Sequence, residues 1–134
     1  LSVKGHLFHF FYLLFSSQGT PVTFNRDKSL DKVKQIVSYI ESHYTEPITV
    51  QSAADYMGFS ESHFMRYFKE TMGTSFVDYL RDYRLTIASR LLTTSDSSIL
   101  DIAAESGFEN LSYFNRVFKQ KYNMTPRQFR KESQ

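Results

Sequence analysis

Cysteine is absent from the 134 residues of the chain, so the chain can form neither a disulfide framework nor a thiolate metal site. A reducing compartment such as the cytoplasm is compatible with this absence. Only three prolines and five glycines are present, which leaves few segments that favour disorder. Apolar and polar residues nowhere alternate in the manner of a β-strand. Hydrophobic residues make up 41% of the chain, enough for one helical domain or two small linked subdomains.

Signals of catalysis and of metal binding are also missing. The chain contains no Ser-His-Asp arrangement at helical or loop spacing, no nucleophile elbow and no glycine loop that could cradle a phosphate. His6 and His9 are three residues apart, but no third ligand lies near them in the sequence. His43 falls close to a predicted helix end, where a cation is favourable. We therefore expect a protein that is not an enzyme and that holds no metal or cofactor.

The first 15 residues are strongly apolar, but a membrane-spanning helix takes about 20 residues. Lys4 and two histidines interrupt them, and no signal-peptide cleavage motif follows cleanly. The sequence begins at Leu1 rather than Met, and we expect residues 1–19 to form a helix whose partner lies outside it. Residues 20–28 lack apolar periodicity and are predicted to be a linker. An alternative is that the apolar segment is itself the functional part, as a dimerisation or membrane-surface helix.

From Ser29 onwards apolar residues recur at steps of three and four, the spacing of amphipathic helices. Pro47 ends the first helix, Thr49 and Ser60 are predicted N-caps, and Gly73 is predicted to end a helix in the left-handed conformation. The sequence thus predicts an all-α, seven-helix array. The predicted helices cover residues 29–44, 50–57, 61–72, 75–94, 98–106, 111–122 and 126–131.

The strongest feature of the sequence is an internal repeat. Residues 50–59 align with 99–108 at an offset of 49, and residues 64–69 align with 114–119 at an offset of 50. Each copy contains an alanine, a glycine four residues later and then a phenylalanine, which together favour a helix, a tight turn and a second helix. The predicted organisation is a first helix-turn-helix subdomain at 29–74, a connecting helix at 75–94 and a second subdomain at 95–134.

The second helix of each copy combines an apolar face with a polar one. The polar faces carry Ser62, His63, Met65, Arg66 and Lys69 in the first copy, and Ser112, Asn115, Arg116 and Lys119 in the second. Arginine and asparagine can hydrogen-bond the edges of guanine and adenine in the major groove. Lysines and helix N-termini can hold phosphates. This pattern predicts sequence-specific binding to double-stranded DNA.

The length of the connecting helix and the distribution of charge favour this prediction. A 20-residue helix spans about 30 Å, close to the roughly 34 Å between successive major-groove faces on one side of DNA. The net charge is only +2, but the segment from Asn110 to the end has six basic residues and one acidic one, or 6 − 1 = +5. The alternative is a helical repeat used for protein contacts, whose binding would depend less steeply on salt.

Residues 29–131 resemble the C-terminal DNA-binding domain of the AraC/XylS transcription regulators. The stretches that carry the resemblance are Ala53 to Ser60, Phe64 to Gly73, Ile102 to Phe108, Ser112 to Lys119, Thr125-Pro126 and Phe129-Arg130. The resemblance implies two helix-turn-helix subdomains joined by a long helix. It also implies a preceding effector and dimerisation domain that senses a small molecule, often a sugar, with residues 1–19 as its last helix. An activator acting near RNA polymerase is implied as well.

The resemblance further implies which residues contact DNA. Base-reading positions fall on Ser62, Met65, Arg66, Leu111, Ser112, Asn115 and Arg116. Phosphate or auxiliary contacts are expected at Thr49, Ser60, His63, Lys69, Ser98, Asn110, Tyr113, Lys119 and Lys121. Met65 and Leu111 depart from the polar residues often found at such positions, and they either touch thymine methyl groups or contribute little.

Overall fold

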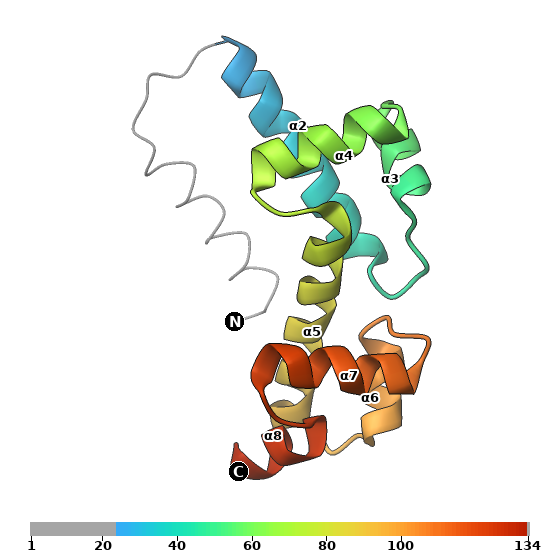
Figure 1. Cartoon of the computed structure of the whole chain (residues 1–134), viewed down its shortest axis with the longest axis vertical. Coiled ribbons are helices and arrows are strands. Elements are labelled where there is room, and N and C mark those ends of the chain that lie inside the picture. Colours follow the sequence, from blue (N-terminus) through green and yellow to red (C-terminus); the bar gives the residue numbers. More distant parts are fainter. Residues whose placement is uncertain (1–23, 134) are drawn as a thin grey trace.

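The computed structural model describes the backbone of residues 24–133 and the side chains of residues 30–133. Within this range the chain forms seven helices and no strand, which confirms the predicted all-α fold (Figure 1). None of these helices is long and apolar enough to span a membrane. The helices are α2 (Phe24–His43), α3 (Val50–Met57), α4 (Glu61–Met72), α5 (Phe76–Thr94), α6 (Ile99–Glu105), α7 (Leu111–Tyr122) and α8 (Pro126–Glu132).

The start of α2 differs from the prediction. The helix begins at Phe24 rather than Ser29, so residues 24–28, predicted to be linker, are helical. Missing apolar periodicity removes the main sequence signal of an amphipathic helix, but it does not exclude a helical backbone. The helix predicted for residues 1–19, with His6 and His9, lies outside the described residues.

Side-chain caps set the ends of the helices. Thr49 Oγ1 accepts a hydrogen bond from Ser52 N at 2.9 Å, and Ser60 Oγ accepts one from His63 N at 3.2 Å, as the sequence predicts. Gly73 closes α4 in the left-handed conformation, and Asn123 does the same for α7. The last turn of α2 is also closed by a side chain, since His43 Nδ1 lies 3.0 Å from the Tyr39 carbonyl oxygen. These caps explain why α3, α4 and α7 have the bounds that the sequence predicts.

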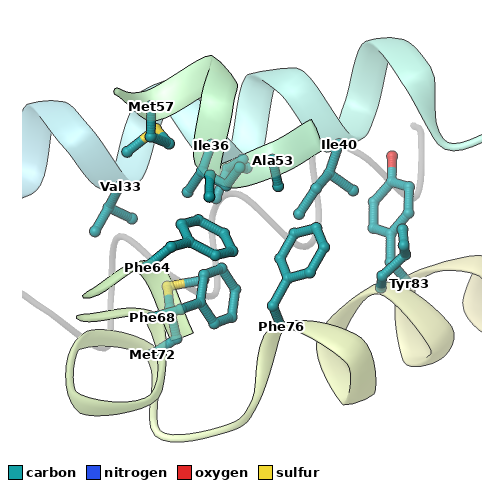
Figure 2. Close-up of a cluster of buried hydrophobic side chains, with 13 residues drawn as sticks. Val33, Ile36, Ile40, Ala53, Met57, Phe64, Phe68, Met72, Phe76 and Tyr83 are labelled. Atoms are coloured by element: carbon teal, nitrogen blue, oxygen red, sulfur yellow. The ribbon is translucent and has the colours of Figure 1, made fainter. Parts of the chain in front are cut away.

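The buried side chains form two separate clusters. The first joins α2, α3, α4 and the N-terminal half of α5, and Figure 2 shows Phe64, Phe68 and Phe76 packed against Ile36 and Ile40. The second joins the C-terminal half of α5 to α6, α7 and α8. The helix α5 is therefore more than a spacer, because its two halves are part of two different cores.

A half-buried arginine makes the same kind of contact in each half of the chain. In the first, Arg84 of α5 donates from Nε to the Tyr44 carbonyl at 2.8 Å and from Nη2 to the Glu46 carbonyl at 2.9 Å. In the second, Arg130 of α8 donates from Nε to the Leu92 carbonyl at 3.0 Å and from Nη2 to the Ser95 carbonyl at 3.1 Å. Each arginine thus satisfies carbonyl groups at or just beyond the C-terminal end of the first helix of its half.

Candidate nucleic-acid interface

The second helices of the two repeats, α4 and α7, lie near opposite ends of α5 with their axes close to parallel in the view of Figure 1. Their inner faces are buried, with Phe64 and Phe68 on α4 and Phe114 and Phe118 on α7 fully inaccessible to solvent. Burial of equivalent faces leaves equivalent outer faces exposed. The repeat in the sequence therefore becomes a repeat of two exposed polar surfaces.

All the residues predicted to contact DNA are exposed. They include Met65 and Leu111, whose apolar side chains are 49% and 38% accessible and so are not part of the core. The set comprises Thr49, Ser60, Ser62, His63, Met65, Arg66, Lys69, Ser98, Asn110, Leu111, Ser112, Tyr113, Asn115, Arg116, Lys119 and Lys121.

Four of these residues have a structural role that limits what they can offer a ligand. Thr49, Ser60, Ser98 and Asn110 are the N-caps of α3, α4, α6 and α7, and each side-chain oxygen accepts a backbone N–H. The hydroxyl hydrogens of the three hydroxyl residues and the amide group of Asn110 can still donate outwards. These side chains are therefore suited to an acceptor such as a phosphate oxygen.

The exposed arginine of α7 is held differently from its counterpart on α4. The Arg116 guanidinium carbon lies 5.1 Å from the ring centroid of Tyr113, one helical turn earlier. At the position equivalent to Tyr113, His63 instead packs edge-on against Phe59, with the ring centroids 4.4 Å apart. The three-residue spacing of Tyr113 and Arg116 is the sequence signal of this contact, because residues three apart are neighbours on a helix.

The basic segment at the C-terminus is less available than its charge suggests. Arg130 is occupied by the two carbonyl groups described above, and Lys121 Nζ lies 3.9 Å from Asp82 Oδ1 on α5. The accessible charge on this segment is therefore lower than the sum of +5 implies. Helix α7 carries three basic residues and no acidic residue, whereas α4 carries two basic and two acidic residues.

A cleft of about 350 Å³ separates the two halves of the chain, lined by the loop before α3, the N-terminal half of α5 and the turn before α7. Gly107 touches the Tyr44 carbonyl across this junction, and the Arg84 side chain lies beside both. Burial lowers the pKa of Arg84, and the charge of Glu109 opposes this shift. The two halves thus meet through backbone groups and one largely desolvated cation.

Comparisons with known proteins decide the family. Residues 53–132 match the family described as a helix-turn-helix domain. A transcriptional regulator from Chromobacterium violaceum with an AraC-type DNA-binding domain superimposes with a TM-score of 0.72 at 31% identity, covering 80% of this chain and 96% of that one. The chain belongs to the AraC-type helix-turn-helix family. It is the DNA-binding domain of a transcription regulator, so the family and fold of this domain are those of regulators and not of enzymes, as expected.

Two further relatives place the AraC-type domain in context. An HTH-type transcriptional regulator from Staphylococcus aureus is 37% identical over 113 residues, which make up 82% of this chain but 15% of that regulator. The chain therefore spans a small part of the length of this relative. The DNA-binding domain of the global transcriptional factor AdpA, solved in complex with a target DNA, superimposes with a TM-score of 0.73 at 26% identity over 75% of this chain and 91% of that one.

Proposed function

We propose that α4 and α7 enter two successive stretches of the major groove on one side of a DNA duplex. The observation that carries this proposal is the pair of equivalent exposed faces at opposite ends of α5. The 19 residues of α5 span about 28 Å at 1.5 Å per residue, somewhat less than the roughly 34 Å of one DNA turn. The duplex would then bend towards the protein, at a cost of about 1–6 kcal/mol.

Each residue predicted to contact DNA has a role under this proposal. Arg66 and Arg116 donate to guanine, and Asn115 pairs with adenine. Met65 and Leu111 contact thymine methyl groups, while Ser62 and Ser112 bond either kind of base edge. Phosphate contacts come from Lys69, Lys119, Lys121, His63 and the capping residues Thr49, Ser60, Ser98 and Asn110, and Tyr113 has an auxiliary role.

We further propose that the complete protein is an activator that responds to a small molecule, such as a sugar, through a domain outside this sequence. Dimerisation through that domain and contact with RNA polymerase at the promoter belong to the same proposal, as does a cytoplasmic location. Support comes from the family and from the share of the Staphylococcus aureus relative that this chain leaves uncovered. In this arrangement residues 1–19 form the last helix of the sensing domain, residues 20–23 belong to the linker, and the DNA-binding region follows.

Selection of duplexes from a random DNA pool with this chain at near-physiological salt tests the DNA-binding proposal. We expect two short motifs about one helical turn apart, with binding that weakens steeply between about 50 and 200 mM salt. A single motif would mean that only one of the two helices reads bases. Failure to enrich any sequence would contradict the proposal.

Two substitutions separate base reading from general attraction to DNA. Arg66→Ala and Arg116→Ala should each weaken binding to the selected duplex by about 1–3 kcal/mol while changing binding to random DNA much less. Arg127→Ala is the matched control, because it removes the same charge from an exposed position on α8. An equal loss on selected and random duplexes would show that these arginines contact phosphates and do not read bases.

A further inference from the structure

The ring of Tyr113 lies between a core side chain and an exposed cation. On one side its centroid is 6.2 Å from that of Phe108, a residue of the second buried cluster. On the other side the Arg116 guanidinium carbon is 5.1 Å from the Tyr113 centroid. The Tyr113 backbone is fixed as well, because its N–H donates to the Asn110 cap at 2.8 Å. The Tyr113 ring therefore links the buried Phe108 to Arg116, a residue proposed to read a base.

A guanidinium over an aromatic face is held electrostatically by the ring quadrupole. A free arginine side chain samples many rotamers and loses that freedom when it binds. A ring beneath the guanidinium restricts these rotamers before DNA arrives, so that less freedom is lost on binding. The planar fork of Arg116 also keeps its donors available, because stacking uses the face of the group and leaves its N–H edges open.

The first repeat lacks this arrangement, which makes it an internal comparison. His63 occupies the position equivalent to Tyr113, but it contacts Phe59 and stacks on Tyr67 at 6.5 Å. Among the aromatic rings of residues 30–133, none lies under the guanidinium of Arg66. Of the two arginines at equivalent positions of the repeat, Arg116 therefore packs on an aromatic ring and Arg66 does not.

We infer that Tyr113 is a positioning residue that holds Arg116 in the geometry for reading a guanine, and that α7 thereby discriminates between bases more sharply than α4. This inference rests on the proposed DNA-binding function. It gives Tyr113 a role through its ring, which differs from a phosphate contact through its hydroxyl group. The two roles predict different behaviour when the hydroxyl alone is removed.

The experiment uses the selected duplex and a version of it changed at the base pair whose recognition Arg116→Ala abolishes. Tyr113→Leu should reduce the affinity ratio of the two duplexes by about two- to fivefold, the range for an exposed cation–π contact, and by up to about thirtyfold if binding desolvates it. Tyr113→Phe keeps the ring and should keep the ratio. Affinity for random DNA should be unchanged in both variants. His63→Leu is the matched control on α4: loss of its phosphate contact should weaken binding to both duplexes equally and leave this ratio unaltered.

A second arm tests whether Tyr113 acts through Arg116. In the Arg116→Ala background, Tyr113→Leu should have no further effect on the affinity ratio, because Tyr113 acts on base recognition only through the guanidinium that this variant lacks. If Tyr113→Phe weakens binding to all duplexes equally, the hydroxyl holds a phosphate and the inference is overturned. It is also overturned if Tyr113→Leu leaves the ratio intact. If the unaltered chain selects no duplex, the DNA-binding proposal itself fails, and this outcome is distinct from both.

Discussion

Gly58 and Gly107 occupy equivalent positions in the repeat, yet alanine should have very different effects at the two. Both glycines have positive φ, 75° at Gly58 and 97° at Gly107, where a side chain is strained. Nothing lies within 4 Å of a Cβ added at Gly58. A Cβ added at Gly107 would collide with the Tyr44 carbonyl oxygen and approach Arg84 Nε to 2.8 Å. The comparison isolates the contact between the two halves from the local requirement for glycine.

The magnitudes follow from these contacts. At Gly58 the cost is the left-handed backbone of a residue with a side chain, about 1–2 kcal/mol. At Gly107 the same cost applies, and the displaced Tyr44 carbonyl also loses its hydrogen bond from the Arg84 cation, worth about 1.5–3 kcal/mol. We expect Gly107→Ala to lower the free energy of unfolding by about 3–5 kcal/mol, a large part of the 5–15 kcal/mol of a typical domain.

Chemical denaturation of the two variants beside the unaltered chain measures this difference. Thermal unfolding should agree, since about 1 kcal/mol shifts the melting temperature of a domain of this size by about 4–8 °C. Arg84→Met in each background provides a further check: it should cost less in Gly107→Ala, where only the hydrogen bond to the Glu46 carbonyl remains to be lost, than in Gly58→Ala, where the bond to Tyr44 is lost as well. Equal destabilisation by Gly58→Ala and Gly107→Ala would refute the reasoning, because it would mean that the junction contributes nothing.

Three further outcomes are expected. Tyr83→Phe should raise the free energy of unfolding by about 1 kcal/mol in a denaturant titration. The reason is that the buried Tyr83 hydroxyl has no hydrogen-bond partner among the described residues. Tyr79→Phe is the control and should give no such gain. Arg130→Met should lower the free energy of unfolding by about 1.5–3 kcal/mol, because the Leu92 and Ser95 carbonyl groups lose their hydrogen-bond donor. Arg127→Met, at an exposed site, should change the free energy of unfolding by less than about 0.5 kcal/mol. Burial and the charge of Glu41 raise the pKa of Tyr79 and Tyr83, so these two residues should lower the free energy of unfolding only above about pH 10, where tyrosines of the unfolded chain lose protons first. Equal stability at about pH 9 and about pH 11 would contradict this last outcome.

Local signals explain why most of the helices could be predicted. An N-cap oxygen, an apolar stripe and a left-handed residue mark the limits of α4 and α7, and for each helix they all lie in one continuous stretch of sequence, from Ser60 to Gly73 and from Asn110 to Asn123. The exposed position of Arg66 and Arg116 follows from the same stripe, because burial of Phe64 and Phe114 turns the opposite face outwards. Because the sequence repeats, the same signals predict the helix ends and the exposed arginine in both halves of the chain.

Contacts between distant segments could not be predicted in this way. Arg84 and Arg130 make the same kind of contact, but they are 46 residues apart, which matches neither offset of the repeat. Their roles are visible only when the chain has brought the carbonyl groups of α2 and α5 beside them. The proximity of Lys121 to Asp82, on a different helix, is likewise visible only in the folded chain. The start of α2 was missed because residues 24–28 show no apolar periodicity in the sequence, and this pattern was the signal on which the helix prediction depended.

The sharing of α5 between two cores bears on how the domain would fit DNA. Leu80 and Tyr83 are buried in the first cluster, and Leu85 and Ala88, within the next two turns, are buried in the second. A hinge between these positions would expose side chains of both cores, and the contact of Gly107 with the Tyr44 carbonyl would break as well. Bending the protein therefore costs buried surface, whereas bending a duplex costs only about 1–6 kcal/mol. Because α5 is shorter than one turn of DNA, we expect the duplex to deform and the protein to stay rigid. Operators with flexible base-pair steps between the two motifs should therefore bind more tightly than operators that have the same motifs but a stiff spacer.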